Sequence, residues 1–278
     1  MNVLAFTTII GLCSLGVGFL GALTGLGGGV VIVPLLALGF GVDIRYAIGA
    51  SLVAVIATSS GAAAAYVKEG FSNIRIGMFL EMATTFGALV GASLATGVST
   101  GVIAIIFGAV LIYSAYLSGR PQPEQQSEAP PDGWATFFKM EAAYPGSEGL
   151  ISYSVHAIPA GFSLMFVAGI LSGLLGIGSG AVKVLAMDHI MRVPFKVSTA
   201  TSNFMIGVTA AASAGLYLNR GYIDPGLAMP VMLGVLLGSL AGARVLPGAK
   251  TGALRLVFAL VILGLGIEMI YNGFTGRL

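Results

Sequence analysis

Long apolar stretches, separated by short polar loops, cover most of this 278-residue chain. A helix that crosses the hydrocarbon core of a bilayer needs about 20 apolar residues, and eight stretches reach or approach that length. They are Val3–Leu23, Ala47–Val67, Ile76–Thr96, Val102–Leu117, Ala157–Leu175, Val197–Leu218, Leu227–Ala243 and Leu254–Tyr271. The pattern predicts an all-α polytopic membrane protein.

Two shorter apolar segments interrupt this series at matching places. Val30–Phe40 follows the first long stretch, and Ala181–Met191 follows the fifth. With 11 residues each, they would rise only about 16 Å as helices, roughly half of the hydrocarbon core. The chain therefore divides into two sets of five helical segments, each with four long segments and one short, broken segment.

The two sets are copies of one another. A shift of 151 positions aligns them without a gap from Gly18 to Tyr116. The identical pairs include Gly25/Gly176, Gly27/Gly178, Gly29/Gly180, Ser51/Ser202, Thr58/Thr209, Tyr66/Tyr217, Gly87/Gly238 and Gly91/Gly242. We expect a first membrane repeat at residues 1–117, a linker at 118–156 and a second membrane repeat at 157–278. Internal duplication is common in secondary transporters, whose substrates bind where the copies meet.

The distribution of Lys and Arg predicts how the repeats are inserted, because basic residues collect on the cytoplasmic side of a membrane. If each short segment crosses, nine basic residues fall on the linker side, and these are Lys68, Arg75, Arg120, Lys139, Arg192, Lys196, Arg244, Lys250 and Arg255. Arg45, Arg220 and Arg277 then fall on the other side. If it does not cross, the same twelve residues divide evenly. The uneven division predicts two inverted repeats and a cytoplasmic linker; chance scatter of the charges is the alternative.

Composition supports a location in a lipid bilayer, which we expect to be the cell inner membrane, and it bears on the possible binding partners. The chain is 56% hydrophobic and 9% charged, whereas soluble domains carry about 25% charged residues. A net charge of +2 is too small to indicate a nucleic-acid partner, so we expect the lipid bilayer and a small anion instead. The single cysteine, Cys13, excludes an internal disulfide. Oligomeric state is not encoded in any pattern we identify.

The linker differs in composition from both repeats. Its first part, after Ser118, is rich in Pro and Gln, which is typical of flexible chain. Trp134–Met140 predicts a short helix at the membrane interface, with Trp134, Phe137 and Phe138 as anchors. We expect this segment to tether the repeats and not to form a catalytic domain.

Both repeats carry a glycine-rich run immediately before the short segment. Such a run can interrupt a helix inside the membrane, and the N–H groups that begin the next helix can bind an anion. The candidate binding residues are Gly25, Gly27, Gly28 and Gly29 in the first run, and Gly176, Gly178, Ser179 and Gly180 in the second. Tight helix packing is the alternative role, but duplication of the run before each short segment favours a binding site.

Polar residues near the start of the following helices are a second group of candidates. Ser51 in the first repeat aligns with Ser202, which lies in the sequence Thr201-Ser202-Asn203. Serine and threonine hydroxyls can cap a helix or donate to a ligand oxygen. Capping does not explain Asn203 at the start of an apolar run, so these four residues are candidates for substrate contact.

Ionisable residues inside a membrane are costly and are functional candidates by default. Lys183 lies in the short second-repeat segment, where the first repeat has Ile32, and it is a candidate for binding an anion. The alternative is that its ammonium extends to the membrane surface. Glu81, Asp188 and His189 are candidates for proton coupling, although the last two could be solvated residues at a helix end.

These motifs resemble the TauE/SafE sulfite exporter family of membrane permeases. The resemblance rests on the Gly25–Gly29 run with Pro34 after it, its second copy, the Ala200–Asn203 run, and the residues Tyr217, Gly221, Gly238 and Gly242. It covers both repeats and implies transport of sulfite, sulfoacetate or other organosulfonates, coupled to the proton gradient. Ser179 and Lys183 depart from the usual pattern and leave the particular substrate open.

The sequence therefore predicts a secondary transporter that exports a small sulfur-containing anion by alternating access around a site at the membrane midplane. We expect no cofactor and no metal centre. An intramembrane enzyme would need a nucleophile with a base, or a metal cluster, and no such set is visible. A permease for a metal cation should have several intramembrane carboxylates, whereas Glu81 stands nearly alone. An anion channel is the alternative that remains open.

Overall fold

The structure is a computed structural model that describes residues 3–24, 28–68, 70–95, 97–118, 133–138, 140, 142–146, 149–245 and 251–276. The long helices follow the apolar stretches of the sequence to within a few residues. In the first half they are α1 (Val3–Thr24), α3 (Ile44–Lys68), α4 (Ile74–Leu94) and α5 (Thr100–Ser118). In the second half they are α7 (Ile158–Leu175), α9 (Phe195–Asn219), α10 (Pro225–Val245) and α11 (Thr251–Thr275). The prediction of a helical membrane protein is confirmed.

Each short segment consists of one α-helical piece followed by a wider π-helical turn. In the first half these are α2 (Gly29–Pro34) and η1 (Leu35–Gly39), and in the second half α8 (Gly180–Leu185) and η2 (Ala186–Ile190). Pro34 removes one backbone donor, yet the second half has Leu185 at that position and forms the same turn. The shared geometry therefore follows from the surrounding fold and not from the proline.

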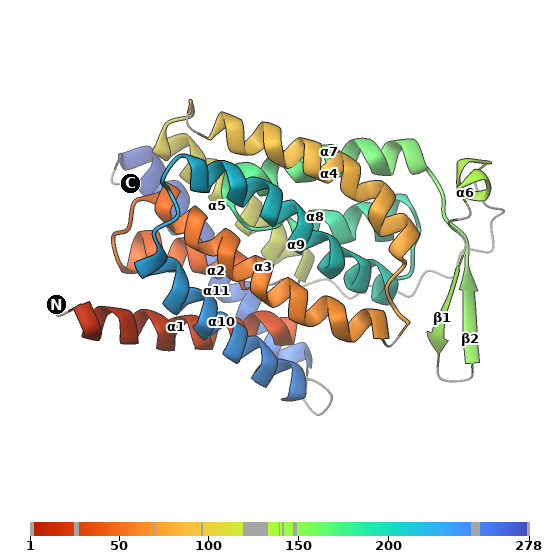
Figure 1. Cartoon of the computed structure of the whole chain (residues 1–278), viewed down its shortest axis with the longest axis horizontal. Coiled ribbons are helices and arrows are strands. Elements are labelled where there is room, and N and C mark those ends of the chain that lie inside the picture. The colour runs from red at the N-terminus through yellow and green to blue at the C-terminus, as the bar shows by residue number, and fades with distance from the viewer. Residues whose placement is uncertain are drawn as a thin grey trace.

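Each half packs its first long helix against the third long helix of the other half. Helix α1 packs against α10, and α7 packs against α4 (Figure 1). A Cβ added to Gly18 would lie 2.3 Å from the carbonyl oxygen of Val235, and one added to Gly169 would lie 2.2 Å from that of Thr84. These contacts are related by the 151-residue offset of the sequence repeat. In both pairs glycine permits the close approach of two backbones.

The remaining long helices pair with their own counterparts. Helix α3 packs against α9 between the two halves, and α5 packs against α11. Helices α3 and α9 also contact α10 and α4, respectively. This arrangement is what a two-fold relation between the halves produces. It brings α3, α4, α8 and α9 together, where the candidate site lies.

Loops far apart in sequence gather at two opposite ends of the molecule. At one end, which we call the termini end (loops 40–43, 97–99 and 220–224), the Arg45 guanidinium lies 5.9 Å from the ring centroid of Tyr222 and donates to the carbonyl of Val98 at 3.3 Å. At the other, the linker end (residues 70–73, 133–138, 142–146, 149–156 and 191–194), the backbone N–H of His156 donates to the carbonyl of Met191 at 3.0 Å. Both chain ends lie on the opposite side of the molecule from the linker (Figure 1).

The linker contains structure that its sequence did not predict. The expected short helix is present as α6 (Gly133–Phe137), and an antiparallel hairpin follows, formed by β1 (Ala142–Gly146) and β2 (Gly149–Tyr153). The linker is therefore more than a tether, and the fold is nearly all-α. The Pro- and Gln-rich stretch at 119–132 lies outside the described residues.

Asn73 attaches the hairpin to the helices. Its amide nitrogen donates to the hydroxyl of Tyr153 at 2.7 Å and to the carbonyl of Met140 at 3.2 Å, while its oxygen accepts from the backbone of Ile76 and caps α4. Its backbone N–H donates to Thr201 of α9 at 3.0 Å. Burial raises the pKa of Tyr153 to about 12, the Asn73 hydrogen bond acting in the opposite direction, so the phenol stays neutral.

Several helices are long and apolar enough to cross a membrane. By length and composition these are residues 74–94, 158–175 and 225–242. Shorter apolar helices of 10–17 residues cover 5–20, 29–39, 44–60, 100–116 and 259–275 within the part of the chain that was searched. The inverted orientation of the two halves stays a prediction.

Candidate functional site

The first turn of α2 meets the second glycine-rich break between the halves. The Ser51 hydroxyl of α3 lies 2.9 Å from the carbonyl oxygen of Gly176 and 3.3 Å from that of Gly29. A Cβ on Gly29 would lie 3.6 Å from the Gly176 oxygen, so the first turn of α2 lies directly against the second break. Ser202 repeats part of this geometry, with its hydroxyl 3.3 Å from the Gly180 oxygen.

The second break requires unusual backbone angles. Gly176 and Gly178 both have φ of +68°, and Ser179 has φ of +44°. The left-handed region is unfavourable for serine, but the Ser179 hydroxyl donates to the carbonyl of Ala168 in α7 at 2.6 Å. A Cβ on Gly178 would lie 2.7 Å from the Ile206 side chain. Ser179 thus attaches the break to α7.

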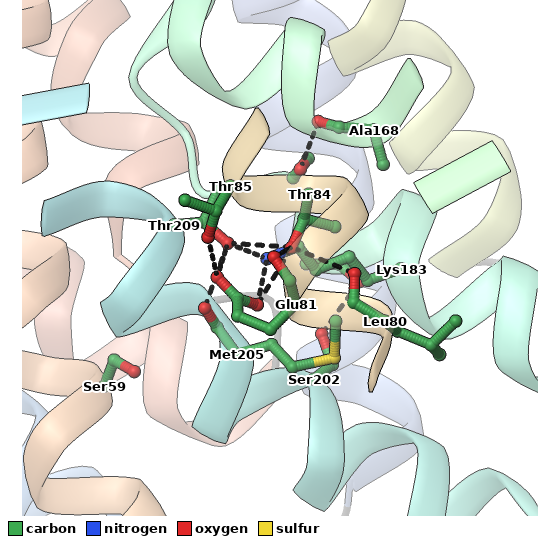
Figure 2. A network of polar contacts seen from close by, with 12 residues as sticks. Ser59, Leu80, Glu81, Thr84, Thr85, Ala168, Lys183, Ser202, Met205 and Thr209 are labelled. Carbon is green, nitrogen blue, oxygen red and sulfur yellow. Dashed lines mark hydrogen bonds and ion pairs between the residues drawn. The ribbon is translucent and has the colours of Figure 1, made fainter. Parts of the chain in front are cut away.

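Lys183 enters the protein interior and not the surrounding medium. Its side chain is fully buried, and its Nζ donates to the hydroxyl of Thr209 in α9 at 2.5 Å (Figure 2). The Nζ lies 3.9 Å from Oε2 of Glu81 in α4. The alternative in which the ammonium extends to the membrane surface is therefore wrong.

Glu81 is held by hydroxyl groups on two helices. Its Oε1 accepts from Thr209 at 2.7 Å and from Thr85 at 3.1 Å, and its Oε2 accepts from Thr84 at 2.9 Å (Figure 2). Glu81, Thr84 and Thr209 are all buried. We call Glu81, Thr84, Thr85, Lys183 and Thr209 the charged network. It joins α4 of the first half to α8 and α9 of the second.

The equivalent location in the other half carries no charge. Under the 151-residue offset, Lys183 corresponds to Ile32, Glu81 to Met232 and Thr84 to Val235. Ile32 and Val235 are fully buried. Thr209 corresponds to Thr58, whose hydroxyl bonds only with carbonyls of its own helix, at 3.1 and 3.2 Å, among the contacts that the structure describes. The duplicated fold thus contains one polar and one apolar version of the same location.

Comparison with known proteins identifies the family. The model of the family described as "Sulfite exporter TauE/SafE" matches residues 10–269. The chain belongs to the TauE/SafE family.

Relatives in this family are described as membrane transporters. The chain is 29% identical over 266 residues to the "Probable membrane transporter protein YunE" of Bacillus subtilis (strain 168), covering 92% of this chain and 94% of the relative. It is 26% identical over 228 residues to YdhB of the same organism, covering 82% of this chain and 83% of the relative. No solved structure matches significantly. This TauE/SafE protein is a membrane transporter.

Other predicted residues of this TauE/SafE protein have structural contacts of their own. Thr201 accepts from the Asn73 backbone, and the Asn203 side chain donates to the Thr199 carbonyl of its own helix at 3.1 Å. Gly28 is the N-cap of α2. Gly25 and Gly27 lie outside the described residues. Ser51, Gly29, Gly176, Gly178, Ser179, Gly180 and Ser202 lie near one another at the breaks, and their contact with substrate stays a prediction.

Asp188 and His189 form a separate pair at the end of the short segment. The Asp188 Oδ2 lies 3.2 Å from Nδ1 of His189, whose side chain is half exposed. Asp188 is buried, so of the two only His189 agrees with a solvated residue at a helix end.

Sequence reasoning missed the threonines of the charged network. Thr84 and Thr85 stand three and four residues after Glu81, on the same helix face, which was an available signal. Thr209 was recognised only as an identity between the repeats. Its contact with Glu81 required the packing of α9 on α4, which no local pattern specifies.

Proposed function

We propose that this TauE/SafE protein is a proton-coupled secondary transporter that exports a small sulfur-containing anion, such as sulfite or an organosulfonate, across the inner membrane. Alternating access would occur around the two glycine breaks and the charged network. The family supports the chemical class of substrate, since its description names sulfite export. The buried ammonium of Lys183 is the observation that carries the proposal.

Lys183 has the properties that an anion site requires. An ammonium has three donors, yet among the described residues Lys183 Nζ makes one hydrogen bond, to Thr209. Its distance of 3.9 Å from Glu81 exceeds the usual range of a direct N–H···O bond, which is about 2.7–3.2 Å. An anion oxygen could therefore occupy a donor without breaking a tight ion pair. Charge inside a membrane is costly, and donors of the ammonium that Glu81 does not reach favour binding of an anion.

The clustering of charges at the two ends supports the proposed insertion. Arg45 and Arg220 border the same group of loops at the termini end, whereas Arg75, Arg192 and Lys196 lie at the linker end. This is the grouping expected when each short segment crosses the membrane. A cytoplasmic linker then follows from the excess of basic residues on its side.

Anion binding to purified protein tests the proposal. We expect thermal stabilisation by sulfite, thiosulfate, sulfoacetate or taurine to identify the preferred ligand, because a ligand that binds the folded state raises its melting temperature. Lys183→Met should weaken the affinity for that ligand at least about tenfold, equivalent to about 1.4 kcal/mol. Lys196→Met, at an exposed position in the first turn of α9, is the matched control and should bind normally.

Two results would contradict this function. Unchanged affinity in Lys183→Met would show that the ammonium does not contact the anion. If the wild-type protein binds none of these ligands, the proposed class of substrate is wrong. In proteoliposomes, a flux that saturates with substrate and accelerates in exchange against substrate on the other side would distinguish a carrier from an anion channel.

A further inference from the structure

We propose that Glu81 acts as an internal substitute for the transported anion. In the empty site its carboxylate balances the charge of Lys183. When Glu81 takes up a proton, Lys183 is released to bind the anion, so that one proton and one anion occupy the site together. This inference rests on the proposed function and assigns its proton coupling to one residue.

The geometry of the pair allows this exchange. The hydroxyl of Thr209 stands between the two charges, 2.5 Å from Lys183 Nζ and 2.7 Å from Glu81 Oε1. The direct separation of 3.9 Å is longer than a hydrogen bond, so Lys183 and Glu81 are bridged and not locked together. An arriving anion therefore competes with a loosely held carboxylate.

The surroundings of Glu81 can hold it in either protonation state. Three threonine hydroxyls, from Thr84, Thr85 and Thr209, lie within 3.1 Å of its oxygens. A hydroxyl donates to an ionised carboxylate, and after rotation it can accept from a protonated one. Glu81 thus keeps hydrogen-bond partners when it becomes neutral. Lys183 differs, because its side chain is fully buried. A buried ammonium is costly unless an anion or a carboxylate lies beside it.

The other half shows that the fold does not need this ion pair. At the equivalent positions Ile32 and Val235 are fully buried and Met232 is half-buried, on helices that pack in the same way. Replacing a buried ion pair with apolar residues is often neutral or stabilising. A pair that is not needed for packing, and that is costly inside a membrane, is best explained by a role in transport.

Other ionisable groups on the neighbouring elements lie away from Glu81. Helix α7 has none, and α8 has only Lys183. On α9, Lys196 lies in the first turn, about 20 Å along the helix from Thr209. On α4 itself, Arg75 lies in the first turn, and on η2 the Asp188 carboxylate contacts His189. Glu81 and Lys183 are therefore the pair whose charges respond to each other directly.

The exchange conserves charge and fixes the direction of coupling. The proton comes from solvent and forms an O–H bond on Glu81, while the anion takes the place of the carboxylate beside Lys183. On release, the anion leaves, the O–H bond breaks, the proton returns to solvent and the ion pair forms again. The proton and the anion therefore move across the membrane in the same direction, so that export proceeds when the outward gradient of the anion exceeds the inward gradient of protons.

Anion affinity measured over a range of pH tests this inference. The probes are sulfate, thiosulfate and sulfoacetate, whose charges are constant near neutral pH, and binding is measured on the purified full-length protein. We expect affinity to rise as pH falls, by up to about tenfold for each pH unit, because one proton is taken up with each anion. In weakly buffered solution, adding the anion to the wild-type protein should raise the pH.

Glu81→Gln imitates the protonated residue and provides the decisive comparison. It should bind the anion at least as tightly as the wild type, with no dependence on pH and no uptake of protons. Glu268→Gln, which removes an exposed carboxylate on α11, should keep the wild-type pH dependence. A Glu81→Gln protein that binds with wild-type pH dependence would overturn the inference.

Two measurements on the wild-type protein keep the test independent of how well the variant folds. If the wild type binds anions but takes up no proton at any pH, Glu81 is not the coupling residue, and the inference fails while the anion site stands. If the wild type binds none of the probes or sulfite, the proposed function itself fails. The two failures are therefore distinguishable.

Discussion

Lys183 and Ile32 occupy equivalent positions in the two repeats, but only Lys183 carries a charge. The difference is matched on the facing helix, where Glu81 corresponds to Met232. The two charged residues lie together in one of the two equivalent locations, and both are replaced by apolar residues in the other. At the scale of single residues, the apolar location can thus be compared directly with the charged network.

This reference yields a prediction about stability. The double variant Glu81→Met with Lys183→Ile should have a melting temperature equal to or above that of the wild type, because it copies a location that already packs without charge. Glu81→Met alone should melt lower, by an amount that corresponds to about 3–5 kcal/mol, since it leaves a buried ammonium uncompensated. Thermal unfolding in detergent measures both. A double variant less stable than the single one would contradict the argument.

At the scale of helices, glycine determines which faces can meet. Gly87 of α4 lies against the Phe166 carbonyl of α7, and Gly238 of α10 lies against the Leu15 carbonyl of α1, with an added Cβ at 2.2 and 2.0 Å from those oxygens. The two contacts are equivalent under the repeat. Backbone cannot move aside as a flexible side chain can, so these positions define the closest approach of each helix pair.

The glycine contacts lead to a second prediction. Gly87→Ala should destabilise the protein by about 1–3 kcal/mol, because the added methyl group forces α4 and α7 apart. Gly264→Ala in α11 is the control, since no atom lies within 4 Å of an added Cβ there. Size-exclusion profiles after a temperature series would detect the difference. Equal melting temperatures for the two variants would show that the α4–α7 contact tolerates expansion.

At the scale of the whole molecule, the linker and the chain termini lie at opposite ends (Figure 1). Each half therefore carries the chain from one end to the other, which requires an odd number of crossings. Four long helices alone would return the chain to the same end. In the proposed insertion the short segment of each half supplies the fifth crossing, as an α-helical piece and a π-helical turn that follow one glycine-rich run.

This arrangement predicts labelling from opposite sides of the membrane. In a Cys13→Ala background, Ser99→Cys at the termini end should react with an impermeant thiol reagent added outside intact cells. Ser152→Cys, exposed on β2, should react only after the membrane is opened, because the proposed insertion places the linker in the cytoplasm. External labelling of Ser152→Cys in intact cells would refute the proposed insertion.

The sequence by itself determined the helices, the duplication and the breaks, because a chain in lipid must satisfy its backbone hydrogen bonds within apolar helices. It also identified Lys183 and Glu81 as unusual, through the cost of charge in a membrane. Only the tertiary structure decided that they share one network with Thr209, because their contact depends on how helices from different repeats pack. The hairpin at 142–153 was likewise missed, since its docking depends on Asn73, a distant residue that reaches Tyr153 only in the folded protein.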